Sequence, residues 1–382
     1  MSCKKLLTLK KMSFVLTSLL ILIVFSPCNC FAFCEPGDSY DNPIVIDSLA
    51  DLEILAQDVN EGKSYQDKYI ILDNDIAIGN DNEPVFWESI GNSNLDSNFD
   101  GTFDGNGHNI KCNICGFSTN STNSLFGIIG ENGSIKNLNV SGKIATNNDN
   151  AVASICHLNY GTINNCTTDT TLVSSGPASS IAFKNYGKIN DCLTLCKLLT
   201  DNEYCAGITI KNNGLIKNCS VNVNFQNIKK TNNSKIAGIT IFNNDNINNC
   251  IVVTNIENSY ENLNSKDLDT SFLIENTAAG ICYINNGKIN DCSFIGDISS
   301  IVSAGIAGIN NSFISDCNVS SNIKGFIASG ISAISKENGE IKNCYCIANV
   351  YSSYLSGNII ALNENNSNPD NCVYEIKIIK KI

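Results

Sequence analysis

Two stretches of the sequence decide the fold, and the second is a close copy of the first: Ala206-Gly207-Ile208-Thr209-Ile210-Lys211-Asn212-Asn213-Gly214-Leu215-Ile216-Lys217-Asn218-Cys219 and Ala279-Gly280-Ile281-Cys282-Tyr283-Ile284-Asn285-Asn286-Gly287-Lys288-Ile289-Asn290-Asp291-Cys292. The closing Ile-x-(Asn/Asp)-Cys recurs in a series that Leu138 opens and Cys372 closes: Leu138, Cys166, Cys192, Cys219, Cys250, Cys292, Cys317, Cys344 and Cys372. Successive members lie 28, 26, 27, 31, 42, 25, 27 and 28 residues apart. A repeat of about 27 residues sustained over this length is typical of a solenoid.

Each repeat predicts short strands separated by turns. Ala206, Ile208 and Ile210 alternate with small or polar residues, which predicts a strand with one buried face. The Asn-Asn-Gly that follows predicts a turn, because Asn and Gly tolerate positive φ. A second short strand begins at Ile216, and alternating apolar residues from Cys219 onward predict a third.

A corner is expected just before each residue of the Leu138–Cys372 series. Ile216 and Cys219 both look inward-facing although they are three residues apart, so the pleat must break between them. The preceding residue is Asn or Asp in every repeat: Asn137, Asn165, Asp191, Asn218, Asn249, Asp291, Asp316, Asn343 and Asn371. These are the non-glycine residues that most readily adopt the left-handed conformation. Three strands and three corners per coil predict an all-β parallel β-helix of about ten coils, roughly 50 Å long.

The chain divides into three predicted parts. Residues 1–32 read as a signal peptide, with a basic start, a short apolar run and a small residue at the end. The alternative is an uncleaved N-terminal anchor, which would be the only membrane attachment. Residues 33–110 form an N-terminal cap and the first coils, with a helix at 48–61 that begins in a capping-box-like Ser48-Leu49-Ala50-Asp51. Residues 111–382 hold the repeats, with a loop insertion at 257–276. We therefore expect a secreted or cell-surface protein.

The N-terminal third carries a motif order that resembles the GLUG repeat of bacterial secreted proteins. The matching pieces are Lys68–Ile76, Trp87–Gly91, Phe99–Ile110, Leu125–Ile129 and Gly133–Leu138, with Phe99-Asp100-Gly101-Thr102-Phe103-Asp104-Gly105-Asn106-Gly107-His108-Asn109-Ile110 the most specific. The likeness is close from Ile46 to about Ile144 and loose in later repeats, where Cys replaces the apolar corner residue. The resemblance implies an exported right-handed parallel β-helix with a short N-terminal capping helix, often on adhesin-like surface proteins. It implies no single activity.

Charge makes nucleic-acid binding improbable. The net charge is −12, and all the basic residues are Lys. The chain therefore lacks Arg, the usual bidentate phosphate clamp and commonest base-reading side chain.

The nineteen cysteines are interpreted mainly as small apolar residues stacked inside the coils. Bridges within the stack would be strained, because parallel Cβ vectors do not suit the disulfide dihedral. Alternative bridge candidates are the off-stack pairs Cys112/Cys115, Cys192/Cys196 and Cys344/Cys346. A metal site at Cys112/Cys115 is a weaker alternative, since two further ligands are missing.

No catalytic, cofactor or metal residues are assigned, and an enzyme is not expected. Neither His108 nor His157 lies in the His-Glu-x-x-His of zinc peptidases, which some relatives carry. The Asp pair, Gly-His-Gly and Arg of β-helical pectin hydrolases are absent as well. Two acidic groups could bind Ca²⁺ but are better explained by turns: Asp73, Asp75, Asp81 and Glu83, or Asp100 and Asp104. His108 is expected to be structural.

Three functions remain open. The first is an exported, non-enzymatic, adhesin-like module that binds a host, matrix or envelope protein or glycan, with Tyr260 and the loop insertion as candidate contacts. The second is a pectin-type polysaccharide lyase or hydrolase, since Lys could replace the usual Arg base. The third is a passive spacer or a module that self-associates end to end through the strand that begins at Cys372.

Overall fold

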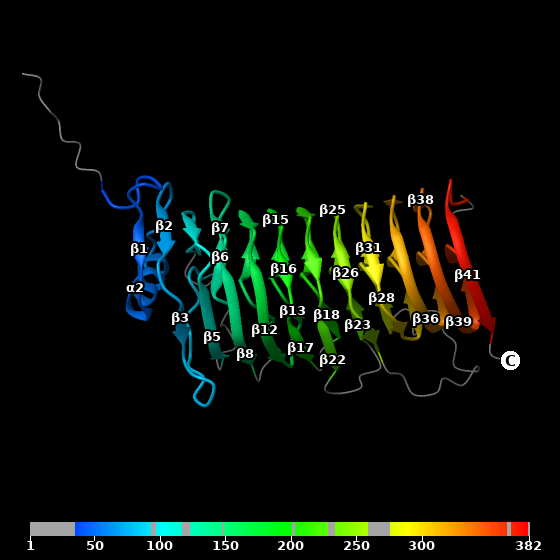
Figure 1. Cartoon of the computed structure of the whole chain (residues 1–382), viewed down its shortest axis with the longest axis horizontal. Helices are drawn as coiled ribbons and strands as arrows, with labels where there is room; N and C mark the ends of the chain where they lie inside the picture. The colour runs from blue at the N-terminus through cyan, green and yellow to red at the C-terminus, as the bar shows by residue number, and fades with distance from the viewer. Residues whose placement is uncertain are drawn as a thin grey trace, which may run out of the picture.

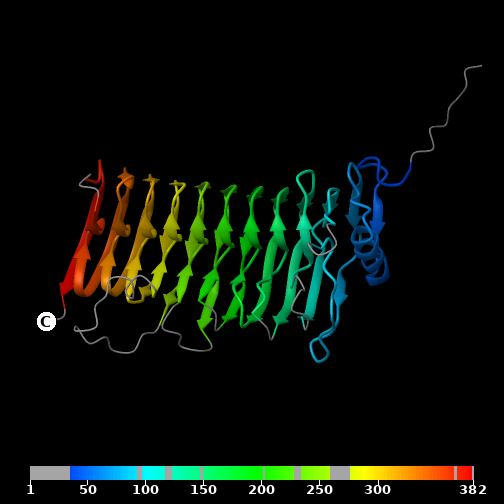
Figure 2. The same cartoon turned by 180° about the vertical axis from the view of Figure 1, so that it is seen from behind.

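The computed structural model is a rod of stacked coils, seen from two sides in Figure 1 and Figure 2. It describes residues 35–92, 97–116, 123–146, 149–200, 203–227, 234–258, 276–364 and 368–380. The predicted all-β, right-handed parallel β-helix with one short helix is confirmed. The predicted signal peptide lies outside the described residues. Within the described ranges, no helix is long and apolar enough to span a membrane.

Three sheets run along the rod. Sheet 1 has 11 strands: β1 (Ile44–Ile46), β2 (Tyr69–Leu72), β4 (Thr102–Asp104), β7 (Ser134–Lys136), β11 (Thr162–Asn164), β15 (Lys188–Asn190), β20 (Leu215–Lys217), β25 (Asn246–Asn248), β30 (Lys288–Asn290), β35 (Phe313–Ser315) and β38 (Glu340–Lys342). Sheet 2 has 9 strands: β6 (Phe126–Ile129), β10 (Cys156–Asn159), β14 (Ala182–Asn185), β19 (Thr209–Asn212), β24 (Thr240–Asn243), β29 (Cys282–Asn285), β34 (Ala307–Asn310), β37 (Ser332–Ser335) and β40 (Ile360–Asn363).

Sheet 3 has 21 strands, because most coils contribute more than one short strand to it. They are β3 (Ile76–Ile78), β5 (Asn109–Gly116), β8 (Asn139–Thr146), β9 (Val152–Ala153), β12 (Thr167–Ser174), β13 (Ala178–Ser179), β16 (Leu193–Thr194), β17 (Lys197–Thr200), β18 (Tyr204–Ala206), β21 (Ser220–Val221), β22 (Asn224–Asn227), β23 (Lys235–Ala237), β26 (Ile251–Val253), β27 (Ile256–Glu257), β28 (Thr277–Ala279), β31 (Ser293–Ile295), β32 (Ile298–Ser299), β33 (Val302–Ala304), β36 (Asn318–Ser329), β39 (Tyr345–Gly357) and β41 (Val373–Lys380).

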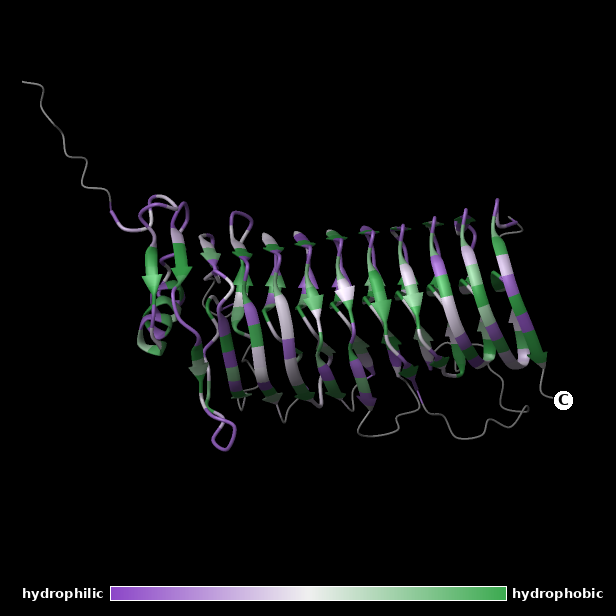
Figure 3. Cartoon of the chain, viewed as in Figure 1, coloured by the Kyte–Doolittle hydropathy of each residue, from purple (hydrophilic) through white to green (hydrophobic). Residues whose placement is uncertain are grey.

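Equivalent residues of consecutive coils pair in parallel, so each position of the repeat becomes a column along the rod. In sheet 1, Ile163 pairs with Ile189, which pairs with Ile216. All three side chains are buried in the main core. In Figure 3, hydrophilic residues, drawn in purple, lie mainly at the turns and on the loop that projects from the rod.

Helix α2 (Leu49–Asn60) covers the N-terminal end of the rod, where Figure 1 shows it beside β1 and β2. The Ser48 side chain accepts from the Asp51 backbone N–H while the Asp51 carboxylate accepts from the Ser48 backbone, so the predicted capping box is present. Leu52, Leu55 and Val59 are buried in the main core. The helix therefore shields the first coil's interior from water.

All nine predicted corners adopt the left-handed conformation. The φ angles of these Asn and Asp residues lie between 49° and 55°. Their side chains also bond along the rod: Asn218 Nδ2 donates to Asp191 Oδ1 at 2.9 Å, and Asn249 Nδ2 donates to Asn218 Oδ1 at 2.9 Å. The corner therefore sets the path of each coil and ties it to its neighbours.

The predicted single strand through Ala206, Ile208 and Ile210 is wrong in one respect. The chain bends at Gly207, so Ala206 ends β18 in sheet 3 while Ile210 lies in β19 of sheet 2. A Cβ on Gly207 would lie 1.9 Å from the carbonyl oxygen of Gly238 in the next coil, so this tight bend excludes side chains. Only Ile208 enters the main core. Ala206 and Ile210 are buried in a second apolar cluster with residues such as Tyr283 and Ile309.

Buried asparagines form a column that the sequence analysis missed, because it assigned Asn212 only to a turn. Five side-chain amide bonds of 2.7 to 2.9 Å link six fully buried residues: Asn159, Asn185, Asn212, Asn243, Asn285 and Asn310. Each of the five bonds satisfies a buried N–H and a buried carbonyl oxygen, and Asn159 Oδ1 at the start of the column has no partner among the described residues. The signal was present in the sequence, because these asparagines recur at the same separations as the cysteine series.

The inward cysteines behave as predicted. The described cysteines are free thiols, including the pairs named as alternative bridges, and most are buried. Stacked thiols donate to the carbonyl two residues earlier: Cys192 Sγ to Asn190 O at 3.1 Å, and Cys317 Sγ to Ser315 O at 3.1 Å. They combine apolar packing with a weak local hydrogen bond.

We predict that Asn218→Ala destabilises the rod more than Asn218→Gly does. Both variants lose the side-chain hydrogen bonds of Asn218 to Asp191 and Asn249. Only alanine is also destabilised by the left-handed backbone conformation, by about 1 kcal/mol. The midpoint of urea unfolding measures the difference. Equal midpoints would show that the corner tolerates any residue.

Asn243→Ala should lower the free energy of unfolding by roughly 2 kcal/mol or more, because it leaves buried polar groups on Asn212 and Asn285 without their partner. Urea unfolding with Asn244→Ala as the exposed control tests this. A loss no larger than that of the control would contradict a structural role for the buried column.

Candidate functional site

A groove runs along the outer face of sheet 3 in the C-terminal half of the rod. It consists of two hollows, of about 690 and 490 Å³, that share Ile295 and Gly296. We define the sheet-3 groove by two columns of residues. The floor column is Asn224, Asn255, Asp297, Asn322, Asn349 and Lys377, and the wall column is Asn222, Val253, Ile295, Ser320, Ile347 and Glu375.

The chain breaks between the wall and floor positions in the coil of β31 and β32, whereas β36, β39 and β41 run unbroken through the equivalent positions. Gly296 lies between β31 and β32 with a φ of 143°, a conformation that side-chain-bearing residues rarely adopt. A Cβ at this position would lie 1.9 Å from the carbonyl oxygen of Thr254. The glycine thus permits the break between the wall residue Ile295 and the floor residue Asp297 in this one coil.

The floor column is a polar ladder held in place by its own hydrogen bonds. Asn255 Oδ1 accepts from the Asp297 backbone N–H at 2.8 Å. Asp297 Oδ1 accepts from Asn322 Nδ2 at 2.8 Å, and Asn322 Oδ1 accepts from Asn349 Nδ2 at 2.8 Å. The amides are therefore pre-oriented, with hydrogen-bonding capacity left for a ligand.

The wall column adds exposed aliphatic surface. Val253, Ile295 and Ile347 are 41%, 44% and 43% exposed. Aliphatic side chains at three wall positions beside fixed polar groups resemble the lining of binding sites, in which apolar area gives contact and a few polar groups give orientation.

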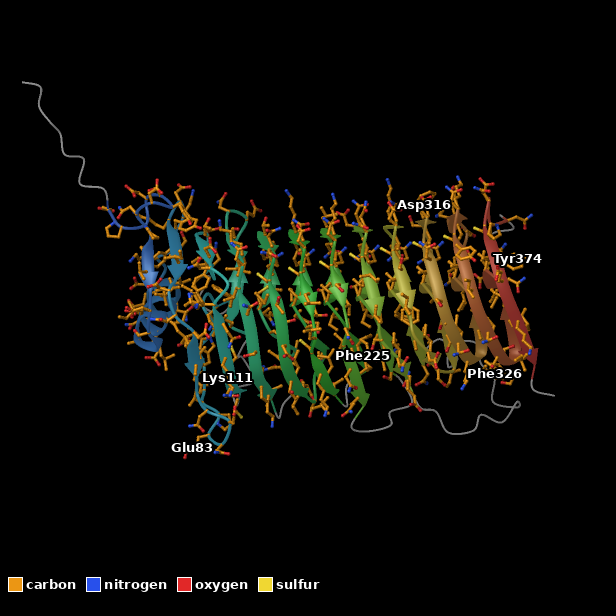
Figure 4. The ribbon with its side chains drawn as sticks, in the orientation of Figure 1. Glu83, Lys111, Phe225, Asp316, Phe326 and Tyr374 are labelled. Carbon is orange, nitrogen blue, oxygen red and sulfur yellow. The ribbon has the colours of Figure 1, made fainter. Side chains whose placement is uncertain are left out.

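The acidic residues considered for Ca²⁺ are separated by the structure. Asp75 Oδ1 faces His108 Nδ1 at 3.1 Å and accepts from the Asn109 backbone at 2.9 Å. Asp81 forms an ion pair with Lys111 at 2.7 Å. Glu83 lies on a loop that projects from the rod in Figure 4, and its backbone N–H donates to Asn80 Oδ1 at 2.9 Å. Within the described ranges, no group of three or more His, Cys, Asp or Glu side chains is placed to hold a metal ion.

Asp104 is a buried structural carboxylate. It accepts from the Tyr69 hydroxyl, from Asn137 Nδ2 at 2.9 Å and from the Asn106 backbone at 2.9 Å, and Lys136 Nζ lies 3.4 Å away. Burial opposes ionisation, but these donors outweigh it and lower the pKa of Asp104 below its usual 3.8. The residue anchors the first corner, Asn137.

Burial shifts the pKa of two other groups that were considered for chemistry, His157 and Cys112. His157 packs against Phe183 with ring centroids 4.8 Å apart, and burial together with nearby Lys184 lowers its pKa to about 4. Burial raises the pKa of the Cys112 thiol to about 12, so it is not a ready nucleophile. The loop insertion and Tyr260 fall almost wholly outside the described residues, which leaves their binding role a prediction.

Comparison with known proteins adds only a distant structural likeness. No protein-family model matches the chain, and no curated protein matches its sequence. A crystal structure described as a "putative immunoglobulin A1 protease" from Bacteroides ovatus is similar with a TM-score of 0.41 and 17% sequence identity, over 89% of this chain and 86% of that chain. The GLUG resemblance stays a prediction that rests on its motifs.

We predict that acid removes the contribution of Asp104 to stability. A lowered pKa means that the contribution is present above the unfolded-state value of about 3.8 and is lost as the pH falls through the lower folded-state pKa. Urea midpoints of the wild type and Asp104→Asn, compared from neutral to strongly acid pH, should converge at the acid end. A constant gap would contradict this assignment.

Proposed function

We propose that the chain is an exported β-helix that binds an extended polysaccharide along the sheet-3 groove without cleaving it. The observation that carries the proposal is the groove itself, a polar floor column over six coils beside a wall column in which Val253, Ile295 and Ile347 are aliphatic. Export is supported by the composition of residues 1–32 and by the resemblance to secreted repeat proteins.

The chemistry of the groove suits a sugar polymer. Asparagine amides offer both donors and acceptors, as sugar hydroxyls require, and aliphatic side chains can pack on the C–H faces of the rings. The coils repeat at roughly 4.8 Å, which is close to the length of one pyranose in an extended chain. With one acid and one Lys in the floor column, the groove favours a neutral or weakly charged polymer.

The second candidate, a polysaccharide lyase or hydrolase, has one observation in its favour: Asp297, Glu375 and Lys377 all line the groove. Strand pairing places the carboxylates of Asp297 and Glu375 three coils apart, on the order of 14 Å. The two carboxylates of a glycoside hydrolase stand only about 5 to 9.5 Å apart. This spacing supports binding over hydrolysis, and the product assay below tests the lyase, because Glu375 and Lys377 lie two residues apart on β41.

Asn322→Ala should weaken polysaccharide binding roughly fivefold, because it removes a neutral hydrogen-bonding group and frees Asn349 and Asp297 to move. The purified chain is tested on a panel of polysaccharides, with binding and release of reducing ends or unsaturated products measured in the same wells. The matched control is Asn244→Ala, which also interrupts an amide ladder but lies at the turn between sheets 2 and 1.

Binding that Asn322→Ala weakens and Asn244→Ala spares, without product, is the expected result. Product release would establish the enzyme instead. Binding to protein ligands alone, or no binding, would reject the polysaccharide proposal.

A further inference from the structure

β41 is the last strand that the structure describes, and it has one described partner in sheet 3. β41 pairs with β39 through residues Val373 to Lys380, and no described strand pairs with its other edge. Tyr374 and Ile378 occupy the inward positions that Cys346 and Val350 fill one coil earlier. They are 50% and 40% exposed, whereas Cys346 and Val350 are fully buried. Figure 4 shows Tyr374 on this terminal rung. An open edge with exposed apolar residues is a template for strand pairing.

The two ends of the rod are not equivalent. Helix α2 covers the interior of the first described coil, so β41 of one copy would meet a helix there instead of a matching strand of sheet 3. This disfavours head-to-tail growth. If two copies associate through the unpaired edge of β41, their C-terminal ends meet, which gives a closed twofold dimer.

The sequence of β41 is self-complementary in one antiparallel register. When the twofold axis passes through Ile376, Glu375 lies opposite the partner's Lys377, and the same pair recurs on the other side of the axis. Tyr374 then lies opposite the partner's Ile378, so the apolar residues that are exposed in one copy cover each other. Inward residues meet inward residues, as the alternation of a strand requires.

The two neighbouring registers that also pair inward residues with inward residues have their twofold axis at Glu375 or at Lys377. Each of them places two like charges directly opposite each other, which is destabilising. We propose that two copies of this chain pair tail to tail through antiparallel β41 strands centred on Ile376. Since Glu375 and Lys377 also line the sheet-3 groove, the groove of one copy would lead into that of its partner.

Charge reversal tests this register. Lys377→Glu and Glu375→Lys each place like charges in both pairs, so each should weaken the dimer Kd roughly tenfold or more, whereas the double variant restores opposite charges and should restore the dimer. Sedimentation equilibrium of the full chain over a range of concentrations measures the Kd. A monomeric wild type, an open series of larger oligomers, or a double variant no tighter than the single ones would overturn the proposal.

A cysteine placed on the twofold axis gives a second test of the antiparallel register, and this test does not depend on charge. Ile376→Cys should form an intersubunit disulfide under mild oxidation, because residue 376 faces its own copy. Ile378→Cys, which faces the partner's Tyr374, is the matched control and should cross-link far less, as should the wild type with its native thiols. Equal cross-linking of the two variants would contradict the register.

Discussion

A single residue in the left-handed conformation, placed before each member of the Leu138–Cys372 series, sets the cross-section of the repeated coils. Without it, Ile216 and Cys219 could not both face the interior, because a regular pleat would turn one of them outward. Asparagine and aspartate bear this conformation at low cost, and their side chains then bond to the corner of the neighbouring coil. The corner therefore determines both the shape of one coil and the register between coils.

Register then converts each position of the repeat into a column. One column buries asparagine amides that satisfy one another, a second stacks thiols, and a third lays fixed amides along the groove floor. Surfaces made in this way are linear and periodic, with a spacing of roughly 4.8 Å. They match extended ligands better than compact ones, and they leave the rod's ends as the places where the pattern is interrupted.

Much of this architecture is predictable from the sequence, because its signals are local or periodic. The corner residues, the capping box at Ser48 and the stacked thiols each depend on residues within one repeat. The bend at Gly207 and the second apolar cluster around Ile210 depend instead on contacts between coils and between sheets. The groove was missed for the same reason, since Val253 and Ile347 become one wall only after the coils have stacked.

Hydrogen–deuterium exchange, with and without a saturating polysaccharide that the chain retains, tests the role of the groove most directly. Slower exchange confined to the groove strands β22, β26, β31, β36, β39 and β41, with sheets 1 and 2 unchanged, is the predicted result. Protection centred on the turns between sheets 2 and 1, or no change in sheet 3, would show that the ligand binds elsewhere on the rod.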